Sequence, residues 1–207
     1  MNLYQRLLGT PFVYNHVRPL AVGGIDMSPF YRRIEARSDS TVLDVGCGTG
    51  DALHYLDTFE RYFGIDTDQV AIGFAENEFG KRPNVEFACR LCDEQDVQRL
   101  QPTEVLLCGV LHHLPDDYAT ELLRLIFRSQ RLRRLVTSDI VYLPREPISN
   151  FFARLDRGKF CRRPDDYVAL ARGAGFEVAE SAIERCHPRT GLAKYWMMTL
   201  KPGRTQS

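Results

Sequence analysis

The fold is decided by the stretch Val42-Leu43-Asp44-Val45-Gly46-Cys47-Gly48-Thr49-Gly50, an apolar run that leads into a glycine-rich turn. A short run rich in aliphatic residues is typical of a buried strand, and a helix is expected directly after the turn. Glycines permit the tight turn and also let a ligand lie against the backbone. Because open parallel sheets bind ligands beyond the carboxyl ends of their strands, this turn is the predicted binding site of an α/β protein.

An acidic residue supports this interpretation, because Asp66 ends the next apolar run. A carboxylate at that position can accept both hydrogen bonds of an adenosine ribose diol. Dinucleotide sites favour the spacing G-x-G-x-x-G, in which a helix N-terminus receives a pyrophosphate. Here the third glycine comes one residue early and Asp51 follows it, so a carboxylate would repel the pyrophosphate. The same electronegative setting, reinforced by Asp44, suits a ligand that bears an ammonium and a sulfonium group.

Strand-like and helix-like segments alternate along the chain, which implies parallel strands joined by right-handed crossovers, with helices on both faces of the sheet. The last two strands are expected to form an antiparallel pair at one edge. The sequence therefore predicts a Rossmann-like, doubly wound, seven-stranded sheet in a single domain, with residues 1–40 as an N-terminal cap or lid and 41–207 as the ligand-binding domain. Strands are expected over 41–45, 62–66, 85–89, 104–108, 135–141, 176–183 and 195–200, and helices over 51–57, 68–79, 94–100, 116–131, 148–155 and 164–173.

Composition narrows the class of protein further. Lys and Arg number 27 and Asp and Glu number 27, so no overall positive field favours a nucleic acid partner. The N-terminus has no secretory leader pattern and no run approaches a membrane span, which predicts a cytoplasmic protein without a membrane-spanning segment. The six cysteines are predicted to be free thiols. Cys89 and Cys92 have C-x-x-C spacing but lack a second ligand pair, so no metal is expected.

The glycine-rich stretch resembles motif I of the class I S-adenosylmethionine-dependent methyltransferases, in the small-molecule group whose motif reads VLDVGCGTG. The resemblance covers about residues 40–143. Gly64-Ile65-Asp66-Thr67-Asp68 is similar to the second motif of the family, in which the first acid holds the ribose and the next residues flank the adenine. The segment from Glu104 to Pro115 is similar to the motif at the fourth strand, which passes beside the methionine part of the cofactor.

This resemblance implies S-adenosylmethionine as cofactor, S-adenosylhomocysteine as product and a small-molecule methyl acceptor. One position departs from the family pattern, because Arg90-Leu91 stands where the family often has Gly-Asp to bind the adenine amino group. Either Asp93 or the backbone of Leu91 and Cys92 would then make that contact. The implied cofactor residues are Asp44, Gly46, Cys47, Gly48, Thr49, Gly50, Asp66, Thr67, Leu91, Cys92, Asp93, Cys108, Gly109, Val110 and His113, together with Tyr14 and Arg18 of the N-terminal segment.

On the acceptor side, His112 and His113 follow the fourth strand, where the reactive methyl group is expected. An imidazole there could act as a base or simply pack beside the cofactor. Asp139 is a carboxylate inside an apolar strand, so it must be paired or face a cavity, and with Tyr142 it is a candidate for the acceptor pocket. Residues 1–18 and the aromatic-rich region 151–160 are predicted to be lids, or else to pack helices onto the sheet.

Two other functions remain open from the sequence, namely a nicotinamide-dependent oxidoreductase and a non-catalytic cofactor-binding or partner protein on the same fold. The glycine spacing counts against the first. The irregular motif after the third strand is the only feature that favours the second. The oligomeric state is expected to be a monomer or a homodimer.

Overall fold

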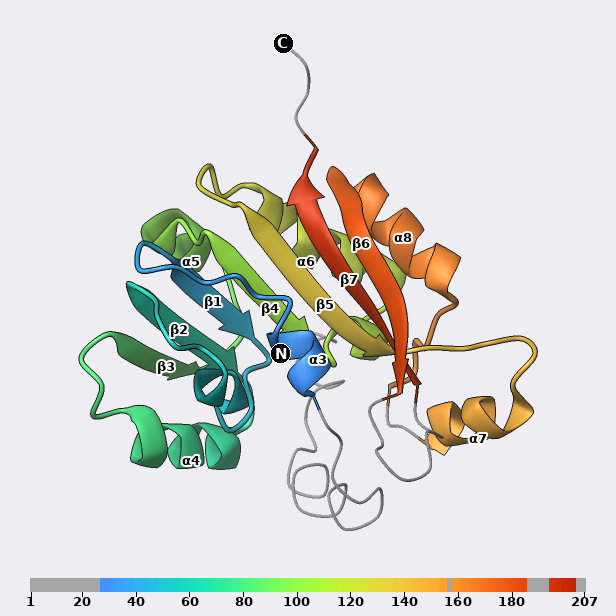
Figure 1. Cartoon of the computed structure of the whole chain (residues 1–207), viewed down its shortest axis with the longest axis horizontal. Coiled ribbons are helices and arrows are strands. Elements are labelled where there is room, and N and C mark those ends of the chain that lie inside the picture. Colours follow the sequence, from blue (N-terminus) through green and yellow to red (C-terminus); the bar gives the residue numbers. More distant parts are fainter. Residues whose placement is uncertain (1–26, 156–157, 186–193, 204–207) are drawn as a thin grey trace.

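The computed structural model describes residues 27–155, 158–185 and 194–203, and within them a seven-stranded sheet of order β3-β2-β1-β4-β5-β7-β6 (Figure 1). β1 to β5 run parallel, and β7 lies antiparallel between β5 and β6. The predicted doubly wound sheet with an antiparallel edge pair is therefore confirmed. The strands are β1 (Thr41–Val45), β2 (Arg61–Asp66), β3 (Val85–Cys89), β4 (Glu104–Cys108), β5 (Arg134–Ile140), β6 (Phe176–Arg185) and β7 (Lys194–Pro202).

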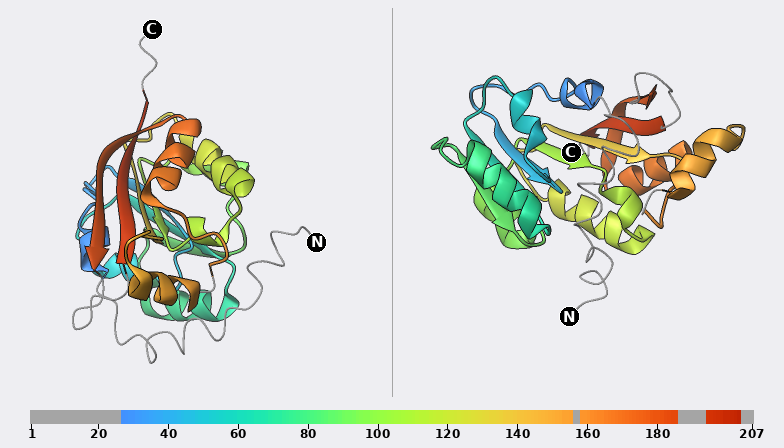
Figure 2. Two further views of the ribbon diagram at one scale, coloured as in Figure 1. Left: turned by 90° about the vertical axis from the view of Figure 1, so that its right-hand side faces the viewer. Right: turned by 90° about the horizontal axis from the view of Figure 1, so that it is seen from below.

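Helices cover both faces of this sheet, as the two views of Figure 2 show. Their placement follows from the chain order, since each of the first four parallel strands is followed by a helical segment before the next strand. Among the described helices, none is long and apolar enough to cross a membrane. The helices are α3 (Ser28–Tyr31), η1 (Asp51–His54), α4 (Gln69–Phe79), α5 (Glu94–Leu100), η2 (Leu111–His113), α6 (Asp116–Phe127), α7 (Pro147–Leu155) and α8 (Pro164–Gly173).

Two predicted helix boundaries are wrong. The expected helix 51–57 is a single 3-10 turn, η1, because its N-cap Gly50 is left-handed and supplies no capping side chain, and Tyr55 closes the turn by bonding the carbonyl of Ala52. The expected helix 116–131 ends at Phe127, since the chain then tightens and the Ser129 hydroxyl donates to the carbonyl of Pro102. Leu132 is thereby turned into the core.

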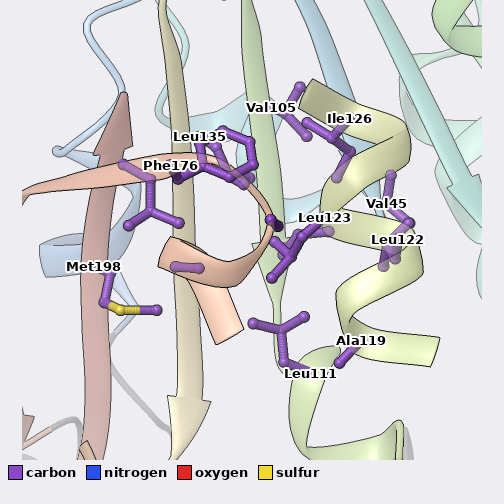
Figure 3. Close-up of a cluster of buried hydrophobic side chains, with 14 of the residues drawn as sticks. Val45, Val105, Leu111, Ala119, Leu122, Leu123, Ile126, Leu135, Phe176 and Met198 are labelled. Atoms are coloured by element: carbon purple, nitrogen blue, oxygen red, sulfur yellow. The ribbon is translucent and has the colours of Figure 1, made fainter. Parts of the chain in front are cut away.

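The core has two layers, one on each face of the sheet. In the first, α6 lays Leu122, Leu123 and Ile126 against β4 and β5 (Figure 3). Phe176 and Met198 of the edge pair extend this layer. The second layer contains Phe30 and Tyr31 of α3, Leu53 of η1, Phe79 of α4 and Val42 of β1, among others. Because strand side chains alternate between faces, the two residues that end a strand serve different layers.

The carboxyl ends of β1, β2, β4 and β5 meet at one edge of the sheet, and α3 lies at that edge (Figure 1). The positions that bear the predicted ligand-binding motifs therefore converge. Tyr14, Arg18 and the lid predicted over residues 1–18 lie outside the described residues. The division at residue 40 stays a prediction.

Candidate functional site

The glycine-rich turn leaves β1 with three glycines in left-handed conformations, Gly46, Gly48 and Gly50, at φ of 77°, 54° and 80°. Side chains rarely adopt such angles, so the turn requires glycine for its shape. The space around the three differs. A Cβ on Gly46 would lie 2.7 Å from Val110 Cγ2, and one on Gly50 would press on Phe79 and Phe87, whereas a Cβ on Gly48 would meet nothing within 4 Å. The turn is therefore open at Gly48, where a ligand can approach the backbone.

The carboxylate of Asp66 is fixed beside this opening. Its Oδ2 accepts the backbone N–H of Gly48 at 2.8 Å, and its Oδ1 accepts the N–H of Asp68 at 2.9 Å. Each oxygen retains acceptor capacity, because an ionised carboxylate offers about four lone-pair positions. Burial raises the pKa of Asp66, and these backbone hydrogen bonds act in the opposite direction. Both oxygens can therefore still accept hydrogen bonds from a ligand, and the role of Asp66 in holding a ribose stays a prediction.

Asp44 lies deeper in the second layer. It is 3% exposed, and its Oδ2 accepts the hydroxyl proton of Tyr62 at 2.7 Å. Burial raises the pKa of Asp44 to about 7, the Tyr62 hydrogen bond opposes the shift, and the charges of Asp66 and Asp51 add to it. Asp51 is exposed in η1 and accepts the Thr49 hydroxyl proton at 2.7 Å. The edge of the sheet around the glycine turn is thus strongly acidic.

The loop after β3 uses its acids locally. Asp93 caps α5 by accepting the N–H of Asp96, and Arg90 holds the Asp96 carboxylate with two hydrogen bonds of 2.6 Å. The departure from the family pattern at Arg90 therefore has a structural role, the anchoring of α5. Leu91 and Cys92 precede the cap, and burial raises the pKa of the Cys92 thiol to about 12. Thr67 follows Asp66 at the end of β2 and is half-buried.

His112 and Asp139 form a buried pair in the first layer. The two side chains are 0% and 1% exposed, and Asp139 Oδ1 lies 2.8 Å from His112 Nδ1 and 3.0 Å from the backbone N of His112. One carboxylate oxygen thus serves the ring and the backbone of the same residue. The pair ties η2 to β5 and is shielded from solvent, which fits a structural anchor better than a group that meets an acceptor.

A second anchor comes from Arg162, which is 7% exposed. Its guanidinium donates to the carbonyls of Leu111, Leu114 and Phe160 at 2.7, 2.6 and 3.1 Å, and pairs with the Asp116 carboxylate. These contacts hold the chain around residues 158–162 against η2. No local motif marks this role, because Leu111, Leu114 and Asp116 lie more than 40 residues before Arg162 in the chain.

The remaining predicted residues lie at the same edge of the sheet. His113 is half-buried, and its ring centroid lies 4.2 Å from that of His112. The ring of His113 therefore packs on the buried ring of His112. Tyr142 is half-buried and donates its backbone N–H to the carbonyl of Arg162. Cys108 ends β4, and Gly109, with a φ of 70°, turns the chain into Val110 and η2. Cys47 is 8% exposed beside the glycine turn.

Among the described residues, no group of three or more His, Cys, Asp or Glu side chains is arranged to hold a metal ion. The described cysteines, Cys47, Cys89, Cys92, Cys108 and Cys161, form no disulfide with one another. The sixth, Cys186, lies outside the described residues.

Comparison with known proteins shows similarity to methyltransferases. Residues 42–131 match a family described as a methyltransferase domain. Phosphoethanolamine N-methyltransferase of Triticum aestivum is 27% identical over 192 residues, which make up 88% of this chain and 36% of that protein. The chain spans little more than a third of the length of this relative and of a second phosphoethanolamine N-methyltransferase, from Arabidopsis thaliana.

Solved structures share the fold. The cyclopropane synthase MmaA2 from Mycobacterium tuberculosis superposes with a TM-score of 0.68 at 10% identity, over 96% of this chain and 93% of that chain. An O-methyltransferase from neocarzinostatin biosynthesis, solved with S-adenosylmethionine and a hydroxy-methyl naphthoic acid, gives a TM-score of 0.64 at 16% identity, over 92% and 56%. At such identities the likeness concerns the fold alone.

The fold and the glycine turn define a cofactor-binding α/β protein of the doubly wound class. Over residues 42–131 the chain is similar to a methyltransferase domain, and along most of its length it is similar to proteins named as methyltransferases.

The acid in the second layer makes folding stability depend on pH. An unfolded aspartate titrates near pH 4 and folded Asp44 near 7, so between these values the folded state holds a proton that the unfolded state has lost. Stability due to Asp44 therefore falls as pH rises through this window. Asparagine does not titrate in this range. The free energy of unfolding of Asp44→Asn minus that of the parent chain should therefore increase by about 2 kcal/mol as the pH rises from 5 to 8. Urea denaturation at both pH values measures this, and a constant difference contradicts it.

The buried pair predicts a second stability effect. Asp139→Ala leaves two buried N–H groups of His112 without their acceptor, so we expect a loss of about 2–5 kcal/mol in free energy of unfolding. Asp139→Asn keeps an acceptor oxygen and should lose less. Urea denaturation compares both with Asp117→Ala, an exposed position of α6. Equal losses in the Ala and Asn variants would show that Asp139 does not anchor His112 in this way.

Proposed function

We propose that this chain binds S-adenosylmethionine at the carboxyl edge of the sheet and transfers its methyl group to a small-molecule acceptor. One observation carries the proposal: the glycine turn is open only at Gly48 among its three glycines, and the Asp66 carboxylate is hydrogen-bonded to the Gly48 amide. A backbone surface free of side chains beside a fixed carboxylate fits an adenosine with its ribose diol.

Roles for this chain's residues follow from their positions. Asp66 would hold the ribose, Gly46 to Gly50 would form the surface beneath the cofactor, and Asp44 and Asp51 would supply negative charge near its cationic end. When bound, S-adenosylmethionine supplies an already activated methyl group on a sulfonium. The protein's main task is then to orient the acceptor in line with that group, which alone contributes several kcal/mol.

On the acceptor side, half-buried His113 and Tyr142 are the candidates to line the pocket, while buried His112 and Asp139 would support them. A small acceptor fits the balanced charge of the chain, 27 basic against 27 acidic residues. The relatives from wheat and Arabidopsis are named for phosphoethanolamine, so this amine is the first acceptor to test. The activity is tested by measuring the release of S-adenosylhomocysteine with phosphoethanolamine and with a panel of small phenols and amines. A reaction without any acceptor is the control.

The function predicts that Asp66→Ala weakens cofactor binding. Charge-assisted hydrogen bonds to the ribose contribute about 1.5–3 kcal/mol, so the dissociation constant should rise by about tenfold or more. Titration calorimetry with S-adenosylmethionine and with NAD measures this and also separates the methyltransferase from the oxidoreductase hypothesis. A folded variant that binds S-adenosylmethionine as tightly as the parent chain would remove Asp66 from the site.

Gly48→Ala tests the open turn directly. The added methyl group would enter the space reserved for the ligand, so we expect cofactor affinity to fall at least tenfold. Gly175→Ala is the matched control, since Gly175 also has a positive φ, 100°, but packs against Phe127 away from this edge. Both variants should lose stability, about 1 kcal/mol or more from the left-handed conformation, and only the first should lose affinity. Parallel losses of affinity would mean that the space at Gly48 has no role.

A further inference from the structure

Tyr31 of α3 lies in the second layer of the core at the carboxyl edge of the sheet, and no motif of the sequence points to it. Its side chain is 8% exposed. The ring stacks on that of Tyr55, with centroids 4.8 Å apart and planes at 14°, and packs edge-on against Phe30 at 5.0 Å. Tyr55 closes η1, so the stack joins α3 to the segment that follows the glycine turn.

The surroundings of the Tyr31 hydroxyl belong to the cofactor end of the site. Burial raises the pKa of the phenol, and Cys108, Asp44 and Asp51 raise it further through their charges. These neighbours come from β4, β1 and η1. Cys108 also packs against the core cluster that contains Tyr31. The tyrosine therefore lies where the ends of β1 and β4 flank the glycine turn.

The hydroxyl has no hydrogen-bond partner among the described residues. Its oxygen is also absent from the group of fully buried side-chain N and O atoms that lack a hydrogen bond. Within the described part of the chain, the ring is thus held by stacking while the oxygen forms no hydrogen bond. Buried tyrosines elsewhere in the chain differ: Tyr62 donates to Asp44, and Tyr167 donates to the carbonyl of Ile140 at 2.9 Å. A tyrosine that is more than nine-tenths buried, and whose oxygen bonds to no described residue, calls for an explanation.

The charge beside Tyr31 indicates what would use this oxygen. Asp44, Asp51 and Asp66 form no ion pair with a described Lys, Arg or His side chain, although surface acids of the chain commonly do. Two of these carboxylates, Asp44 and Asp51, act on the Tyr31 phenol, and together with an oxygen that can accept a hydrogen bond they make a site suited to a cationic group.

We propose that Tyr31, held in place by Tyr55, binds the cationic methionine end of S-adenosylmethionine through its hydroxyl, together with Asp44 and Asp51. The inference rests on the proposed function and assigns a cofactor-binding residue outside every motif that the sequence displays. Tyr55 is a positioning residue, because it reaches the cofactor end only through the ring of Tyr31. The adenosine end is left to Gly48 and Asp66.

Tyr31→Phe tests this with little change to the packing, since the stacked ring is kept. The two probes are S-adenosylmethionine and 5′-methylthioadenosine, which has the adenosine and a neutral sulfur but no amino-acid group. By calorimetry we expect Tyr31→Phe to weaken S-adenosylmethionine binding about tenfold and to leave the affinity for 5′-methylthioadenosine unchanged. Asp66→Ala should weaken both.

Tyr167→Phe is the matched control, because its hydroxyl is already bonded within the protein. It should lower the melting temperature without changing the affinity for S-adenosylmethionine. Tyr31→Phe should lower the affinity and leave the melting temperature nearly unchanged. An affinity of Tyr31→Phe within twofold of the parent chain, or an equal loss for both probes, would overturn the assignment of Tyr31. Failure of the parent chain itself to bind S-adenosylmethionine would instead overturn the proposed function, and this inference with it.

Discussion

The hydrogen bond from the Gly48 amide to the Asp66 carboxylate is the contact on which the rest of the site depends. It joins the turn after β1 to the end of β2, two segments that the parallel register of Val45 with Ile65 brings level. The amides of Gly46 and Cys47 bond the Ile65 carbonyl in the same corner. Because the backbone itself sets the position of the carboxylate, the ribose site proposed at Asp66 would be preorganised before any ligand arrives.

This arrangement concentrates acidic side chains where the ligand is expected. Their burial lowers the stability of the free protein. Asp44 is buried with a hydroxyl as its hydrogen-bond partner, and Asp66 is partly desolvated. A bound cation would lower the free energy of both carboxylates. The destabilisation of the free protein would therefore be offset on binding, which favours the bound state. The acids elsewhere show the contrast: Asp96 has Arg90, and Asp39 has Arg133.

How much the sequence predicts depends on whether the determinants are local. The strand and turn around Gly48, and Asp66 at the next strand end, are determined by short apolar runs and by glycine, and the parallel direction of β1 to β5 follows from the alternation of elements. The order of the strands in the sheet is seen only in the structure. The ends of η1 and α6 were misjudged because they depend on Gly50 and on a Ser129 bond to a distant carbonyl. Tyr31 and Arg162 could not be predicted, since their partners are brought together only by the folded sheet.

The two groups of candidate residues lie on opposite faces of the sheet, and this division has a chemical consequence. Tyr31, Asp44 and Cys108 belong with the second layer, whereas β5 directs Asp139, like its core neighbour Leu135, to the first. The acidic, aromatic face suits the cationic cofactor, and the His112–Asp139 pair stiffens η2 from the other side. Both groups of candidate residues lie toward the carboxyl edge of the sheet (Figure 1). If the proposed site is right, we expect an acceptor to approach from the ends of β4 and β5, where η2 and His113 lie, so that the segments covering this edge would determine its identity.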